Sequence, residues 1–247
     1  MRNIELEQLI HQHLDSGSFQ DFAPNGLQVE GRAEVKRIVT GVTACQALLD
    51  AAVEQGADAV LVHHGYFWKN EPPVVTGMKR RRLKTLLAHD INLFAWHLPL
   101  DAHPVLGNNA RLAALLDINV KGQLEPLVPW GEFSPAVSAP ELQRRLAMRL
   151  EREIVHCGDN APAQIARLAW CSGGGQGFIE QAARAGMDAF ITGEVSEQTI
   201  HIAREMGLHF FAAGHHATER GGIKALGDWL AREHGFDVTF IDIPNPA

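Results

Sequence analysis

Cysteine is scarce in this 247-residue sequence, and the three cysteines lie far apart, at Cys45, Cys157 and Cys171. An odd number of cysteines without a Cys-x-x-Cys pair supports neither a disulfide framework nor a zinc ribbon. We therefore expect reduced, partly buried thiols and no structural zinc held by thiolates.

The sequence also lacks any apolar run near the roughly 20 residues that span a bilayer. Acidic residues interrupt the first seven positions, where a signal peptide needs a continuous apolar stretch. Asp and Glu number 29 against 22 Lys and Arg, a formal net charge of -7. Because nonspecific nucleic-acid binders need a surplus of cations, we do not expect nucleic acid to be the main ligand. A cytoplasmic protein without a membrane partner is predicted.

Hydrophobic residues make up 46% and charged residues 21%, an ordinary globular composition. Apolar runs alternate with helical patterns, which predicts an α/β fold with largely parallel sheets. Strands are predicted at 37–43, 58–62, 91–96, 154–157, 167–171, 189–192, 208–213 and 237–241. Glycine and proline punctuate residues 121–131, which predicts an N-terminal lobe at 1–122, a connection at 123–131 and a C-terminal lobe at 132–247. No repeat is strong enough to indicate duplication.

Polar or glycine-rich groups follow five of these apolar strands. They are His63-His64-Gly65, His97 with Asp101, Ser172-Gly173-Gly174-Gly175, Thr192-Gly193-Glu194, and Gly214-His215-His216 with Glu219. In open parallel sheets, ligands bind beyond the carboxyl ends of the strands. We therefore expect these groups to meet at one sheet edge.

Taken singly, each of these groups has an ordinary structural interpretation. His63-His64 could form a turn with one capping and one solvated imidazole, and Asp101 could be a solvated loop carboxylate. His215 and Glu219, four residues apart, share one face at a helix start, where a glutamate also favours the helix dipole.

Taken together, His63, His64, Asp101, His215 and Glu219 supply three imidazoles and two carboxylates. This set suits Zn, Fe, Mn or Co, and it exceeds the three ligands of a single catalytic zinc. We predict two divalent ions per chain, with Glu219 bridging them. His97 could be a sixth metal ligand, but a catalytic role in which it orients Asp101 or a substrate is favoured. A catalytic role is also predicted for Glu194, the next carboxylate to consider if Glu219 is not the bridge.

Two further motifs each have two interpretations. Ser172, Gly173 and Gly174 could expose successive N–H groups as an anion site, or they could form only a flexible turn after a strand. No Gly-Lys-Ser/Thr follows, so this is not a Walker motif. The basic run at 79–84 is interpreted as the solvated face of a helix.

The motifs become recognisable as an ordered set. They run from Asn25-Gly26-Leu27-Gln28-Val29 through His63-His64-Gly65, His97 with Asp101, Ser172-Gly173-Gly174-Gly175 and Thr192-Gly193-Glu194 to Gly214-His215-His216-Ala217-Thr218-Glu219. The chain resembles the NIF-three-like family, also labelled GTP cyclohydrolase I type 2 homologues. The resemblance implies two interlinked α/β lobes, a dinuclear metal centre in the cleft between them, and a ring-shaped homohexamer. Some members of the family carry a large domain between the lobes, but no inserted domain is expected in a chain of this length. It assigns the metals to His63, His64, Asp101, His215 and Glu219.

Two functions are compatible with these expectations. The first is a metal-dependent hydrolase acting on a nucleotide-like or cyclic amide substrate, in which two ions would activate a water molecule. The alternative is a non-catalytic ring, a scaffold or partner-binding protein that uses its metals structurally or for metal handling. An open coordination position would favour the enzyme, and saturated protein ligation would favour the scaffold.

Overall fold

The computed structural model describes residues 1–247, which form two compact units. Unit 1 comprises Met1–Gly107 and Gly222–Pro244, and unit 2 comprises Asn108–Gly221 and Asn245–Ala247. The chain therefore passes from one unit to the other three times. The predicted division at 123–131 is wrong, because these residues belong to a β-hairpin inside unit 2. Glycine and proline mark the turns and edge strands of a hairpin as readily as a linker.

Unit 1 holds a five-stranded sheet in the order β1-β4-β3-β2-β11. Its elements are α1 (Asn3–His13), η1 (Ser16–Ser18), β1 (Gly26–Val29), β2 (Arg37–Thr43), α2 (Gln46–Glu54), β3 (Ala59–His64), α3 (Gly77–Ala88), β4 (Asn92–Ala95), α4 (Leu98–Ala102), β11 (Asp237–Phe240) and most of α9 (His215–His234). Only β1 runs antiparallel to its neighbour, so the prediction of a largely parallel sheet is confirmed for this unit.

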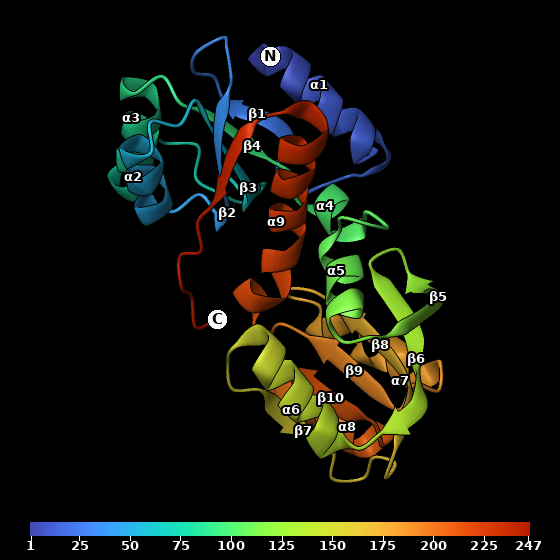
Figure 1. Cartoon of the computed structure of the whole chain (residues 1–247). Helices are drawn as coiled ribbons and strands as arrows, with labels where there is room; N and C mark the ends of the chain where they lie inside the picture. Colours follow the sequence, from blue (N-terminus) through green and yellow to red (C-terminus); the bar gives the residue numbers. More distant parts are fainter. The chain divides into compact units, whose positions relative to one another are not determined.

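Alternate residues of the unit 1 strands face opposite sides of the sheet, as the period of a β-strand requires. Val39 and Val60 pack with α2 and α3, whereas Ile38 and Leu61 pack with α1 and α9. Figure 1 shows α2 and α3 on one side of this sheet and α1 and α9 on the other. Helices on both faces explain why β2 and β3 are buried almost continuously rather than at alternate residues.

Unit 2 holds a six-stranded sheet in the order β5-β6-β8-β9-β10-β7. Its elements are α5 (Asn108–Leu115), β5 (Asn119–Glu125), β6 (Val128–Val137), α6 (Ala139–Leu150), β7 (Val155–Cys157), β8 (Ile165–Cys171), η2 (Gln176–Phe178), α7 (Ile179–Arg184), β9 (Ala189–Thr192), α8 (Glu197–Met206), β10 (His209–Ala212) and the start of α9. Strands β8, β9 and β10 are parallel, but β5, β6 and β7 join antiparallel, so this sheet is mixed.

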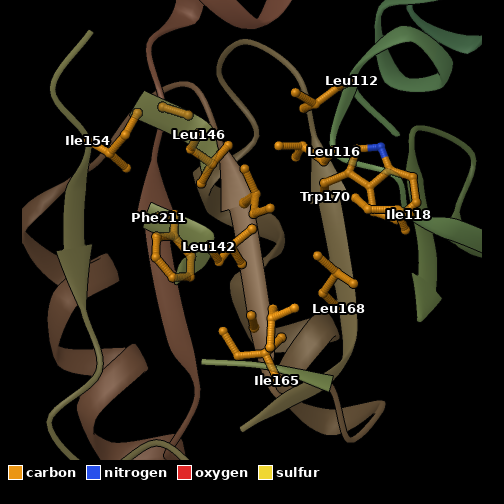
Figure 2. Packing of buried hydrophobic residues seen from close by; sticks show 14 of the residues in the cluster. Leu112, Leu116, Ile118, Leu142, Leu146, Ile154, Ile165, Leu168, Trp170 and Phe211 are labelled. Carbon is orange, nitrogen blue, oxygen red and sulfur yellow. The ribbon is translucent and has the colours of Figure 1, made fainter. Parts of the chain in front are cut away.

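Helices α5 and α6 cover one face of the unit 2 sheet. Figure 2 shows Leu142 and Leu146 of α6 beside Phe211 of β10, with Trp170 of β8 near Leu116. The opposite face packs against α7 and α8.

The five strand ends that carry polar groups belong to two sheets, not to one. Strands β3 and β4 lie in unit 1, and β8, β9 and β10 lie in unit 2. The expectation of a single sheet edge is therefore wrong, because sequence periodicity identifies strands but not their partners. The three cysteines form no disulfide, as expected. No helix is long and apolar enough to cross a membrane.

Candidate metal centre

His63 is the last residue but one of the buried strand β3, and its side chain is fully buried. Its Nδ1 lies 3.0 Å from the main-chain carbonyl oxygen of Trp96. A carbonyl can only accept, so Nδ1 carries a ring proton, and in the neutral imidazole Nε2 then carries the lone pair. That Nε2 lies 3.5 Å from Oδ1 of Asp101, on helix α4. This tautomer is the one that a metal ligand needs.

His64 follows at the end of the same strand, and its ring lies 4.5 Å from the ring of His63. Its Nδ1 is 3.4 Å from Oγ1 of Thr43, at the end of the neighbouring strand β2. The ring of His97 completes the group, 5.1 Å from His63 and 5.6 Å from His64. One ring nitrogen of each of the three histidines lies within 4.8 Å of the others.

His97 is held by Asp21, a residue that the sequence analysis did not identify. The Nδ1 atom of His97 is 2.7 Å from Oδ1 of Asp21, whose side chain is 3% exposed. The carboxylate also accepts hydrogen bonds from the Leu98 N–H and from the side-chain amide of Asn25. Burial opposes ionisation, but the bonds from His97, Asn25 and Leu98 lower the pKa of Asp21 to about 2. Asp21 is therefore a fixed carboxylate that orients the imidazole of His97.

His215 begins helix α9 in unit 2 and lies between two carboxylates. Its Nε2 is 3.2 Å from Oε2 of Glu219, one turn further along the helix, and its Nδ1 is 2.7 Å from Oε1 of Glu194. The hydrogen bond to Glu219 raises the pKa of His215 to about 9. Burial opposes this shift, whereas the negative charges of Glu219 and Glu194 and the bond to Glu194 add to it. The hydrogen bond from His215 in turn lowers the pKa of Glu194. Glu219 itself is buried.

The glycine run after β8 is shaped by close packing against this pair. Gly173 has a φ of +65°, and a Cβ there would clash with Oε1 of Glu219 and lie 3.0 Å from Nε2 of His215. The N–H groups of Ser172 and Gly173 donate to side-chain oxygens, 2.9 Å from Asn109 and 3.0 Å from Thr218. These bonds favour the structural turn over the anion site. Anion binding at Gly174 stays a prediction.

The donor atoms of both units fit a divalent metal. In unit 1 the imidazoles accompany the buried carboxylate of Asp101, and in unit 2 the imidazole of His215 accompanies Glu219. Nδ1 of three of these rings faces a carbonyl or carboxylate oxygen, the kind of partner that typically supports a metal-bound histidine. Nitrogen and oxygen donors without thiolate suit zinc, iron, manganese or cobalt.

Comparison with known proteins agrees with the resemblance in the motifs. A model of the family described as DUF34/NIF3 (NGG1p interacting factor 3) matches residues 1–246. The chain belongs to the DUF34/NIF3 family. A Yersinia pestis relative named "GTP cyclohydrolase 1 type 2 homolog" is 69% identical over 247 residues, covering all of both chains.

Solved structures of the family share the fold of this chain. A structure described as protein ybgI, of unknown function, is 68% identical and superposes with a TM-score of 0.99. A protein from Thermus thermophilus is 32% identical, with a TM-score of 0.93. Both comparisons cover 100% of each chain. The predicted family and the predicted α/β fold are therefore confirmed.

Within this family fold, the predicted residues form two groups. Unit 1 brings together His63, His64, His97 and Asp101, and unit 2 brings together His215, Glu219 and Glu194. Asp21 was missed, although it lies in the irregular segment just before the Asn25 motif. A loop carboxylate gives no periodic signal, so only its contact with His97 reveals its role.

Proposed function

We propose that the chain is a dinuclear metal-dependent hydrolase that acts on a nucleotide-like or cyclic amide substrate. In this proposal His63, His64 and Asp101 of unit 1 and His215 and Glu219 of unit 2 hold the two ions. The observation that carries it is the fixed tautomer of His63, because a buried imidazole with Nδ1 on a carbonyl and Nε2 near a buried carboxylate suits a metal ligand. The relatives' name, with its reference to GTP cyclohydrolase, supports the nucleotide-like class of substrate.

Two bound ions would supply a nucleophilic water near neutral pH and would polarise the bond to be cleaved. Because Asp21 holds Nδ1 of His97, proton transfer would take place at Nε2 of this ring. His97 would accept a proton there from the attacking water and would then donate it to the leaving nitrogen of the substrate. Glu194 would keep the imidazole of His215 oriented through Nδ1. Both predicted catalytic residues thus have roles that their contacts support.

The test is a hydrolysis assay of the metal-loaded chain with GTP and with cyclic amides. Asp101→Asn should reduce turnover by at least about 100-fold, because it removes a charged ligand. His201→Ala is the matched control, since His201 is a 60% exposed histidine of α8, and it should leave turnover unchanged. Full metal loading with no turnover on any compound would favour the non-catalytic scaffold instead.

The proposal includes two ions per chain and a ring of six copies. Metal analysis after reloading with Zn²⁺, Mn²⁺, Fe²⁺ or Co²⁺ should approach two ions per chain, and a maximum of one would contradict the dinuclear centre. Light scattering at micromolar concentration should give the mass of a hexamer. A stable monomer under those conditions would contradict the ring.

A further inference from the structure

The loop between β3 and α3 carries aromatic side chains directly beside the histidines of unit 1. The ring of Trp68 lies 5.0 Å from the ring of His97, nearly perpendicular to it, and 5.9 Å from the ring of His64. Trp68 is half-buried, and the neighbouring Phe67 is 39% exposed. Aromatic surface is therefore presented to solvent next to groups that can hold a metal.

A second loop brings another exposed ring to the same region. The main-chain carbonyl of Phe22 accepts a hydrogen bond from the N–H of Lys69, 2.7 Å away. Phe22 follows Asp21, the carboxylate that holds His97, and its side chain is 60% exposed. We call Phe22, Phe67 and Trp68 the aromatic rim. Its members come from two loops that both contact His97 or its partner.

The aromatic rim is rigidly built. Oε2 of Glu71 accepts from the N–H groups of Phe67 and Trp68, at 2.7 and 3.2 Å, and Oε1 of Glu71 pairs with Lys79 at 3.3 Å. The indole Nε1–H of Trp68 donates to the carbonyl of Gly65. The only polar atom of the indole is thus used inside the loop, and the surface that remains is apolar. A loop fixed in this way loses little entropy when it binds a ligand.

Phe67 shows that this arrangement is strained. It has a φ of +64°, in the left-handed region that a bulky residue rarely adopts. Its ring contacts Nζ of Lys79 at 5.0 Å and lies edge-on to Tyr66, yet 39% of Phe67 stays exposed. A strained backbone that keeps an aromatic ring in contact with solvent is typical of a binding loop.

We propose that the aromatic rim binds a planar aromatic or heteroaromatic ring, with Trp68 as the residue that stacks on it. The assignment rests on the proposed function, because a ring on Trp68 would lie beside His97 and His64, where hydrolysis would occur. Any planar ring can stack on an indole, so the aromatic rim would select planar ligands without distinguishing among them. The metal-binding groups would then act on the edge of the bound ring.

The experiment measures binding of guanosine, which has a ring but no phosphate, to the Mn²⁺-loaded full chain by calorimetry. Trp68→Leu should weaken guanosine binding about tenfold or more, as loss of one stacked base predicts. Trp68→Phe keeps a ring and should bind within about threefold of the wild type. Leu87→Ser removes a 59% exposed apolar side chain from α3 and should change nothing. Metal content should be equal in all variants.

Three results would overturn the proposal. The first two are no guanosine binding by the wild type and unchanged guanosine binding by Trp68→Leu. The third is a change of oligomeric state in Phe22→Ser or Phe67→Ser with guanosine binding intact. The last result would make the aromatic rim an interface between copies. Binding that depends on Trp68 without any hydrolysis would contradict the proposed enzyme but not the rim. Hydrolysis with the KM unchanged in Trp68→Leu would contradict the rim but not the enzyme.

Discussion

The two units contain the same run of elements but carry different side chains at the ends of its strands. In unit 1 the run is β2-α2-β3-α3-β4, and in unit 2 it is β8-α7-β9-α8-β10. In each unit the three strands are parallel, and the second of them in sequence, β3 or β9, lies between the other two. Ala59 pairs with Ile38 and Asn92, and Ala189 pairs in the same way with Leu168 and His209.

An aspartate precedes the central strand in both units and makes the same contacts. Asp58 accepts the N–H groups of Lys36 and Arg37 at 2.9 Å through one carboxylate oxygen. Asp188 accepts those of Ala166 and Arg167 at 2.9 and 2.8 Å. The units therefore share this contact of Asp58 and Asp188, which we call the aspartate lock, as well as the topology of the three strands.

The two units differ in the residues at the carboxyl ends of these strands. Strand β3 ends in His63-His64, whereas β9 continues into Gly193-Glu194. Beyond β4 a histidine precedes an aspartate by four residues, and beyond β10 a histidine precedes a glutamate by four. Unit 1 is thus rich in imidazole, and unit 2 places one imidazole between two carboxylates. The same run of elements thus carries a different set of candidate metal ligands in each unit.

The largest expected effect tests whether these halves work as one centre. If Glu219 bridges both ions, Glu219→Gln removes a negative charge from each, and both ions should bind more than about 100-fold more weakly. His64→Ala should weaken chiefly one ion. Calorimetric metal titration of both variants measures this. Loss of only one ion from Glu219→Gln would mean that each unit holds its own metal.

Gly173→Ala should disturb Glu219 without removing its charge. The added methyl group would collide with Oε1 of Glu219, so the metal ions that Glu219 is proposed to hold should bind about 10- to 100-fold more weakly. Gly77→Ala in unit 1 is the control, because Gly77 also has a positive φ, +52°, but open space around it. Metal titration and thermal unfolding should separate backbone strain, common to both variants, from the collision. Equal metal affinity in the two variants would contradict the packing role of Gly173.

The two carboxylates that hold ring nitrogens allow a direct comparison. Glu194→Gln in unit 2 and Asp21→Asn in unit 1 each replace the acceptor of a histidine Nδ1–H. Glu194→Gln should weaken metal binding about tenfold. Asp21→Asn should instead lower turnover about tenfold with metal affinity unchanged, because His97 is proposed to move a proton. Metal affinity and turnover are measured side by side, and a loss of metal binding in Asp21→Asn would make His97 a metal ligand.

The smallest effect distinguishes the two aspartate locks. Asp58 also pairs with Arg32 at 2.9 Å, so Asp58→Asn should cost about 2 kcal/mol of unfolding free energy, and Asp188→Asn about 1 kcal/mol. Although burial opposes ionisation, the two backbone bonds and Arg32 lower the pKa of Asp58 below its ordinary 3.8. The stabilisation by the ionised Asp58 carboxylate is therefore complete above its ordinary pKa of 3.8 and is lost as the pH falls through the lowered pKa. Urea unfolding at pH ~6 and pH ~3 should show the wild type losing its advantage over Asp58→Asn, and a constant difference would contradict the lock.

Most of the central elements could be predicted from the sequence. The strands predicted at 37–43 and 189–192 agree with β2 and β9 to the residue, because buried strands carry a recognisable apolar pattern. The β5–β6 hairpin was missed since most of β5 is exposed and polar. The repeat between the units was also missed, as it is carried by strand register and by Asp58 and Asp188, which are single residues.

The candidate ligands could be predicted because strand ends place polar groups in a known position. The hydrogen-bond partners of the histidines could not be predicted. The partner of His63 is the main-chain carbonyl of Trp96, which no side chain reveals, and the partner of His97 is Asp21, 76 residues away in the sequence. The unit boundaries were wrong because helix α9 is uninterrupted where the chain passes from unit 2 to unit 1, between Gly221 and Gly222.

That continuous helix has a consequence for synthesis on the ribosome. Unit 1 begins the chain, yet its core includes Ile223, Leu226 and Leu230 of α9, and β2 pairs with β11, in which Asp237 lies 200 residues after Arg37. Nearly all of unit 2 lies in one segment, from 108 to 221. Because long-range contacts form late, the second unit should fold first, and the nascent first unit must wait with an open sheet edge.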